Sequence, residues 1–184
     1  MQIAIGLLGV FAIAAFGFMA DLPASQPAVI EQVDIERYMG TWYAVASIPT
    51  TFERDCARGT TAEYELLENG QVQVTNTCYR EDGTPFQAVG RAWVPSPDEP
   101  GKLKVSFVSL FGKWFFPGDY WILELEPNYS YAVVGHPKLR YGWILSRTPT
   151  LPEATLQEIF GRLEEAGYSR SQFRRIDPQE PAVT

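Results

Sequence analysis

Between positions 41 and 147 the chain repeats short β-type runs separated by turn signals, and this repetition constrains its fold more than any other feature. The runs read TWYAVASI, GTTAEYELL, QVQVTNTCYR, FQAVGRAWV, KLKVSFVSL, DYWILEL, YSYAVVG and YGWILSR. Connections such as ENG, EDGTP and EPN are short and rich in turn residues, as hairpins require. Eight such runs predict an all-β fold, an eight-stranded antiparallel up-and-down β-barrel. A sandwich would more often need long crossovers, and the spacing offers none.

Alternation within several runs gives the strands one apolar and one polar face. Val72 and Val74, for example, alternate with Gln71 and Gln73. The later runs at 121–125 and 132–134 are apolar on both faces. Another element must therefore cover the outer side of these later strands.

The segment after the last run supplies that cover. Apolar residues at 156, 159, 160 and 163 follow the i, i+3, i+4, i+7 spacing, which predicts one amphipathic helix over 152–166. Thr150 and Glu153 fit a capping box at its start, and Gly167 fits a helix stop. We expect this C-terminal α-helix to pack outside the barrel, followed by a short strand at 173–176.

The N-terminal region predicts export. Residues 3–20 form an uninterrupted run of 18 apolar or glycine residues, which indicates a signal peptide or a retained N-terminal anchor over 1–20. A Pro/Ala/Ser/Gln-rich linker over 21–32 precedes a barrel domain at 33–177 and a tail at 178–184. In either case the body crosses a membrane, and a periplasmic, membrane-associated or extracellular location is expected. The remaining alternative is a start codon assigned too early.

Charge and motif content exclude several classes of protein. The formal net charge of −7 argues against a nucleic-acid partner, which needs a basic stripe. The sequence holds no CxxC pair, P-loop or GxGxxG, and its single histidine, His136, does not favour a metal site. No cofactor is expected. Cys56 and Cys78, an even number behind an export signal, predict a disulfide, with a free nucleophilic thiol as the alternative.

Two segments resemble the lipocalin family, in its bacterial lipocalin and apolipoprotein D branch. Gly40 and Trp42 lie in "GTWY", which resembles the G-x-W motif that opens the first lipocalin strand. Arg147 in "YGWILSRTP" resembles the arginine that ends the last barrel strand, while the middle motif is altered to "PNY" at 127–129. The resemblance covers roughly 33–176. It implies that a small hydrophobic molecule binds inside the barrel.

These motif residues have a structural interpretation. Gly40 allows a tight turn where a short helix at 34–39 crosses the barrel floor. Trp42 is a wide apolar plug for that floor, and Arg147 can lay its guanidinium on the indole. One end of the barrel is then closed. The mouth loops at the other end are 49–58, 80–85, 110–118 and 136–140.

The alternation places a set of side chains on the inward face. The expected ligand-binding residues are Ala46, Tyr64, Val74, Phe107, Trp121, Tyr131 and Trp143, with Ala44, Ala88 and Gly90 also facing inward. Small residues leave room and aromatic residues offer an apolar wall, which suits an acyl chain or an isoprenoid. The alternative is that these side chains simply fill the interior.

The mouth loop "SLFGKWFFPGD" concentrates apolar side chains where exposure is expected: Phe111, Trp114, Phe115 and Phe116. Exposed apolar clusters mark interaction surfaces, so the loop is interpreted as a membrane anchor or a lid over bound lipid. Alternatively it folds inward as a stopper. Five rim cations are candidates for an anionic head group: Arg54, Arg58, Arg80, Lys138 and Arg140.

The leading functional hypothesis is a non-enzymatic protein that carries or sequesters fatty acids, lysophospholipids or similar lipids near a membrane surface, as a monomer or weak dimer. The first alternative is a lipid-modifying enzyme of an isomerase or de-epoxidase type. Glu124 is the one acid in its apolar run, and an isolated carboxylate makes no catalytic pair. The second alternative is an interaction module without a ligand.

Overall fold

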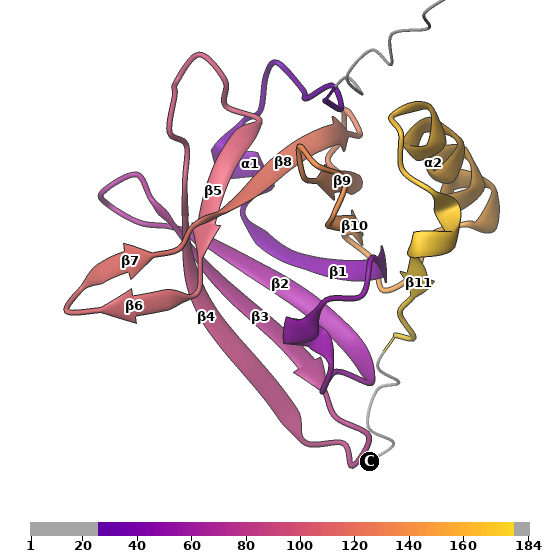
Figure 1. Ribbon diagram of the computed structural model, residues 1–184, viewed down its shortest axis with the longest axis horizontal. Coiled ribbons are helices and arrows are strands. Elements are labelled where there is room, and N and C mark those ends of the chain that lie inside the picture. The colour runs from indigo at the N-terminus through magenta and orange to yellow at the C-terminus, as the bar shows by residue number, and fades with distance from the viewer. Residues whose placement is uncertain (1–25, 179–184) are drawn as a thin grey trace, which may run out of the picture.

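The computed structural model describes residues 26–178 and shows a closed antiparallel barrel (Figure 1). Neighbouring strands follow the order β10-β9-β8-β5-β4-β3-β2-β1, and a β10–β1 pairing closes the ring, which confirms the eight-stranded barrel. The barrel strands are β1 (Gly40–Ser47), β2 (Arg58–Leu66), β3 (Val72–Tyr79), β4 (Pro85–Trp93), β5 (Lys102–Ser106), β8 (Gly118–Leu125), β9 (Tyr131–Gly135) and β10 (Gly142–Ser146). The other elements are α1 (Ile35–Tyr38), η1 (Thr51–Glu53), β6 (Val108–Leu110), β7 (Lys113–Phe115), α2 (Glu153–Glu165), η2 (Arg170–Gln172) and β11 (Arg174–Arg175).

The predicted single strand over 102–110 is wrong, because the chain leaves the barrel at Phe107. β6 pairs only with β7, and this separate two-stranded sheet projects from the barrel in Figure 1. The hydroxyl group of Ser106 fixes the departure, since it hydrogen-bonds to the carbonyl oxygen of Phe115. β4 therefore pairs with β5 only at 91–93, and the mouth half of β4 lacks that neighbour.

The short strand expected at 173–176 is confirmed as β11, and it completes the barrel wall. β1 pairs with β2 only from Gly40 to Tyr43, so the two strands separate toward the mouth. β11 pairs with the remaining part of β1, and the Gly59 amide of β2 donates to the Asp177 carbonyl at 2.8 Å. The segment around β11 thus fills the gap between the first two strands.

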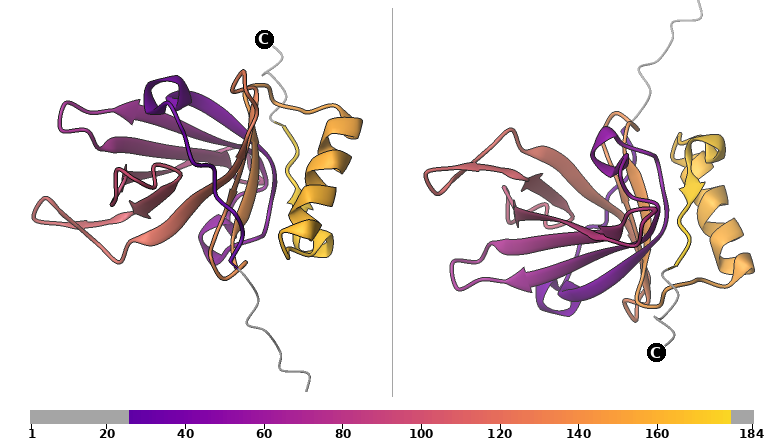
Figure 2. Two further views of the ribbon diagram at one scale, coloured as in Figure 1. Left: turned by 90° about the horizontal axis from the view of Figure 1, so that it is seen from above. Right: turned by 90° about the horizontal axis from the view of Figure 1, so that it is seen from below.

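The predicted helix is confirmed as α2, which covers one outer side of the barrel (Figure 2). Its apolar stripe packs against outward side chains of the barrel, among them Val133 and Ile144. We call these outward side chains, together with the apolar stripe of the helix, the outer cluster. The predicted capping box is wrong: the N-cap position is Pro152, and Glu153 pairs with Arg175. Gly167 ends the helix with a φ of +94°, as expected.

At the closed end, Trp42 is fully buried and Arg147 lies over its ring, with the guanidinium carbon 3.8 Å from the ring centroid. The same guanidinium donates to the carbonyl oxygens of Thr41 and Arg37, at 2.9 and 2.8 Å. The Trp42 indole donates to the Tyr38 carbonyl at 2.8 Å. Strand β1, helix α1 and the end of β10 are therefore joined through one cation.

The described part of the chain begins at residue 26, within the predicted linker. Ile30 donates its amide to the Ile122 carbonyl at 3.0 Å and packs against the barrel core. The predicted signal peptide or anchor at 1–20 lies outside the described residues. Within residues 26–178, no helix is long and apolar enough to span a membrane.

Replacing Arg147 with alanine should lower the free energy of unfolding by about 2–3 kcal/mol, because a cation–π contact and two hydrogen bonds disappear. Chemical denaturation measures the change. The matched control is Arg140→Ala, which removes an exposed arginine at the mouth. Equal stabilities of the two variants would contradict a role for Arg147 in closing the barrel.

Candidate functional site

The closed half of the barrel interior is packed with side chains, which we call the inner cluster. Tyr64 and Val74 belong to it, and Trp143 packs against it, as expected for inward-facing residues. The inner cluster also contains Tyr38, Trp42, Ala44, Ala62, Val72, Ala92, Leu103, Ile122, Ala132, Val134 and Leu145. Any ligand inside the barrel would therefore have to lie in the mouth half.

Three residues predicted to face inward lie on the outer side of the wall. Ala46 belongs to the outer cluster, because a bulge between Ala44 and Ala46 shifts the alternation of β1 by one residue. Tyr131 packs against the same cluster, since its neighbour Ala132 is the inward residue. Trp121 is flanked by two inward residues and packs under the Lys102 ammonium group, 4.9 Å from the ring centroid.

Phe107 lies on the inner side at the point where β5 ends. A Cβ atom added to Gly90 would lie 2.7 Å from the Phe107 ring, so the ring packs directly over the glycine backbone. Gly90 is opposite Val74 of the inner cluster, which places both on the inward face. The Phe107 side chain is 42% exposed, and it offers an apolar wall in the mouth half.

A cluster of tyrosine hydroxyl groups marks the boundary of the packed half. The Tyr120 hydroxyl lies 2.9 Å from that of Tyr38 and 3.0 Å from that of Tyr64, and so connects β8 with α1 and β2. Burial raises the pKa of Tyr64 to about 12 and raises the pKa of Tyr38 and Tyr120 well above the usual value. The cluster is therefore uncharged at neutral pH.

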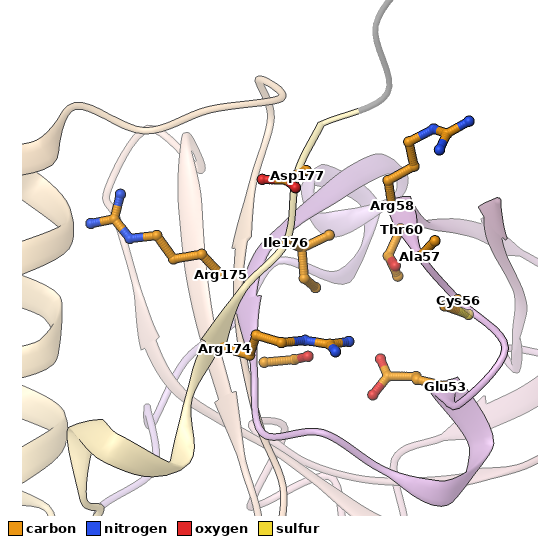
Figure 3. Close-up of a pocket in the computed structure, with 10 residues that line it drawn as sticks. Glu53, Cys56, Ala57, Arg58, Thr60, Arg174, Arg175, Ile176 and Asp177 are labelled. Carbon is orange, nitrogen blue, oxygen red and sulfur yellow. The ribbon is translucent and has the colours of Figure 1, made fainter. Parts of the chain in front are cut away.

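A pocket of about 190 Å³ lies at the mouth, where β11, β1, β2 and η1 meet (Figure 3). Charged side chains dominate its lining: Glu53, Arg58, Arg174, Arg175 and Asp177. In Figure 3, Arg174 and Glu53 reach toward each other, whereas Arg175 turns away toward α2. Arg58 and Asp177 also point away from the centre of the pocket, so Arg174 and Glu53 are the charged side chains that face its interior.

Glu53 is held in place by two donors. The Trp143 indole donates to one carboxylate oxygen at 3.2 Å, and the Thr50 hydroxyl donates to the other at 3.0 Å. Cys56, which follows closely in the chain, forms the predicted disulfide with Cys78, with the two Cα atoms 5.5 Å apart. The mouth loop that carries Glu53 is thereby tied to β3.

Of the five rim cations expected from the sequence, only Arg58 lines this pocket. Arg80 covers the Phe86 ring, and Arg54 donates to the Thr51 carbonyl. Arg174 was missed as a site residue because it follows the helix and lies outside the predicted mouth loops. The alternation of the 173–176 strand could have identified Arg174 as inward-facing. That interpretation required knowing that β11 completes the barrel wall.

The aromatic mouth loop forms the β6–β7 hairpin, and its side chains divide into two groups. Phe111 and Phe116 are 94% and 85% exposed, with Phe115 at 38%. Trp114 instead packs near β4, where its ring lies 5.5 Å from the Arg91 guanidinium carbon. Phe111 and Phe116 both have positive φ, at 50° and 54°. Two exposed aromatic residues therefore occupy a backbone region that disfavours them.

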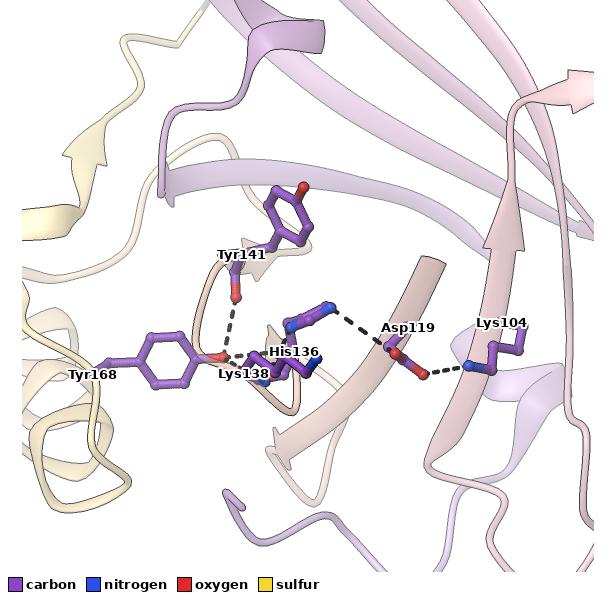
Figure 4. Close-up of polar contacts among 6 residues, drawn as sticks. All are labelled: Lys104, Asp119, His136, Lys138, Tyr141 and Tyr168. Carbon is purple, nitrogen blue, oxygen red and sulfur yellow. Dashed lines mark hydrogen bonds and ion pairs between the residues drawn. The ribbon is translucent and has the colours of Figure 1, made fainter. Parts of the chain in front are cut away.

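His136 lies in a polar network beside the mouth (Figure 4). The Tyr168 hydroxyl bonds to the His136 backbone, and the Lys138 amide donates to the imidazole Nδ1 at 3.0 Å. The imidazole Nε2 lies 3.9 Å from an Asp119 oxygen, and Asp119 also pairs with Lys104 at 2.6 Å. Nδ1 accepts a hydrogen bond here, which requires a neutral ring.

Glu124, the carboxylate considered for acid–base chemistry, is paired with neighbouring side chains. Glu124 faces the helix, where Arg162 pairs with it at 2.8 Å and the Tyr131 hydroxyl donates to it at 2.7 Å. This carboxylate is therefore outside the barrel. No group of three histidine, cysteine, aspartate or glutamate residues able to hold a metal ion occurs within residues 26–178.

Acidification should destabilise the fold through His136. Burial lowers the pKa of His136, with Arg140, Lys138 and Lys104 acting in the same direction and Asp119 opposing them. The unfolded chain, with a pKa of about 6.5, therefore binds the proton first as the pH falls, and the free energy of unfolding decreases below that pH. Denaturation at about pH 7.5 and about pH 5.5 measures this loss.

The control for this loss is His136→Asn, whose side-chain oxygen can still accept the Lys138 amide. This variant should lose less stability than the native protein between the two pH values. An identical loss in both proteins would assign the pH dependence to other groups.

Comparisons with known sequences and structures agree with the barrel fold described above. A family model described as "Lipocalin-like domain" matches residues 33–178. The chain is 35% identical to outer membrane lipoprotein Blc of Vibrio cholerae over 152 residues, 82% of this chain and 85% of the relative. It is 39% identical to apolipoprotein D of Rattus norvegicus over 138 residues, 71% of this chain and 69% of the relative.

The solved structure of insecticyanin from Manduca sexta shares the fold, with a TM-score of 0.65, 23% identity and 86% of each chain covered. The family model spans the closed end, the mouth pocket and the hairpin alike. The chain therefore belongs to the lipocalin family, whose members bind small hydrophobic ligands.

Proposed function

We propose that the protein binds an acyl-chain ligand, of the fatty acid or lysophospholipid class, in the mouth half of the barrel and carries or sequesters it without chemical change. The observation that carries this proposal is a barrel closed at one end by Trp42 and lined at the other by accessible apolar side chains. Phe107, which covers Gly90, and the small residue Ala88 offer a wall along which a flexible chain can lie.

A non-enzymatic role fits the chemistry of the site. Both cysteines are joined, so no free thiol is available as a nucleophile. The mutually bonded phenols of Tyr38, Tyr64 and Tyr120 are neutral. Glu124 is on the outer side, paired with Arg162. We place the protein outside the cytoplasm, with support from the disulfide and from the relative named as an outer membrane lipoprotein. We further propose that it acts as a monomer or weak dimer.

The β6–β7 hairpin is proposed to contact a membrane surface. Val108, Leu110, Phe111 and Phe116 are each at least half exposed, which forms an apolar tip beside the mouth. The net charge of −7 argues against attraction to anionic lipid as the main force. Insertion of the aromatic tip would place the barrel mouth where a lipid can enter or leave.

Ligand binding is tested with a brominated stearic acid, because bromine quenches tryptophan fluorescence on contact. The delipidated protein should show saturable quenching at one ligand per chain. Most of the quenching should disappear in Trp143→Phe, since Trp143 lies on the inward face at the mouth.

The matched control is Trp121→Phe. This variant should retain the quenching, because Trp121 lies on the outer face. Absence of saturable quenching in the folded native protein would refute binding of this ligand class. Equal loss in both variants would instead place the ligand outside the barrel.

Phe111→Asn separates membrane contact from folding. Phe111 and Gly112 occupy the two central positions of the hairpin turn, both with positive φ, and Asn-Gly is the preferred pair there. The variant should gain about 0.5–1 kcal/mol in unfolding free energy while binding phosphatidylcholine vesicles several-fold more weakly.

Vesicle sedimentation and denaturation of the same samples measure the two effects. Leu66→Ser, which removes a partly exposed apolar side chain at the closed end, should leave vesicle binding unchanged. Undiminished vesicle binding by Phe111→Asn would exclude the hairpin tip as the contact.

A further inference from the structure

The mouth pocket carries a second inference, which rests on the proposed acyl-chain ligand. Its charged residues can be assigned to faces of the barrel from the strand register. Arg174 is directly opposite Ser47, and Ser47 is opposite Trp143, which packs against the inner cluster. Cross-strand partners share a face, so Arg174 is on the inward side of the wall.

The neighbouring residue has the opposite orientation. Arg175 is opposite Ala46 of the outer cluster and pairs with Glu153 of α2 at 2.6 Å. Ile176, two positions after Arg174, packs against the inner cluster. The alternation of β11 thus sends one arginine to the helix and the other into the barrel mouth.

The Arg174 side chain forms no salt bridge or hydrogen bond with any residue between 26 and 178. Glu53 reaches into the same pocket from η1, held by Trp143 and Thr50, yet the two side chains form no ion pair. A cation and an anion therefore face one cavity without forming an ion pair with each other.

We propose that this pocket binds the zwitterionic head group of an amphiphilic ligand, with its phosphate at Arg174 and its ammonium group at Glu53. A guanidinium group binds phosphate through paired, charge-assisted hydrogen bonds. A phosphate alone would face the nearby Glu53 carboxylate, which disfavours it, whereas an adjacent ammonium group turns the same carboxylate into a partner.

The size of the pocket agrees with a head group rather than a whole ligand. Its volume of about 190 Å³ is below the roughly 300–1,000 Å³ of a complete small-molecule site. Ile176 and Trp143 connect the pocket with the apolar interior, where the acyl chain would continue. The head group would thus bind at the β11 side of the mouth, and the acyl chain would lie along β4.

The test compares three ligands that share one oleoyl chain, titrated into the full protein by calorimetry. Lysophosphatidylethanolamine carries phosphate and amine, lysophosphatidic acid carries phosphate alone, and monoolein is uncharged. The native protein should bind the zwitterion most tightly. Arg174→Gln should weaken binding of the zwitterion about tenfold and leave monoolein unchanged.

Two further variants sharpen the assignment. Glu53→Gln keeps an oxygen that can accept the Trp143 indole, and it should remove the preference for the zwitterion over lysophosphatidic acid. Arg140→Gln makes the same charge change as Arg174→Gln at another exposed part of the mouth, and it should affect none of the three ligands.

The outcomes distinguish this inference from the proposed function. If all three ligands bind equally well to the native protein, the acyl-chain function stands and the head-group site is overturned. If Arg140→Gln weakens the zwitterion as much as Arg174→Gln does, the effect is general charge and the site is likewise overturned. If none of the ligands binds, the proposed function itself fails.

Discussion

The contact between Arg147 and Trp42 is the interaction on which the rest of the structure depends. One guanidinium group covers the indole at 3.8 Å and also satisfies two backbone carbonyl groups, so the start and the end of the barrel strands meet at a single charge. The barrel consequently has a closed end and an open end. Every functional feature, from the pocket to the hairpin, follows from that asymmetry.

The sequence predicted the barrel and its closed end well, because period-two runs, hairpin turns and an amphipathic helix are local signals. It was less reliable about which side chains face inward. A bulge in β1 moves Ala46 outward, and bulges arise from how strands meet in space. Trp121 and Tyr131 lie in strands that are apolar on both faces, where alternation cannot separate inside from outside. The inward orientation of Arg174 follows from the pairing of β11 with β1, which is known only once the barrel is assembled.

The mouth combines a strained backbone, and charges that are not paired with each other, with contacts that hold the region together. Phe111 and Phe116 adopt positive φ while exposed to solvent, and Arg174 and Glu53 face one pocket unpaired with each other. The Cys56–Cys78 disulfide and the indole bond to Glu53 hold the same region together. The closed half, by contrast, combines dense packing with neutral, mutually bonded phenols. Rigidity and adaptability are thus segregated along the barrel axis.

The position of β11 has a consequence for how the molecule is made. The strand that fills the wall between β1 and β2 follows every other barrel strand and the helix in the chain. During synthesis the first two strands therefore emerge long before the segment that bridges them. Their separated halves stay unbridged until that segment has been made. A chain interrupted after α2 would carry a closed floor and an unfinished rim. Ligand capture in this protein would then also depend on synthesis of the segment around β11.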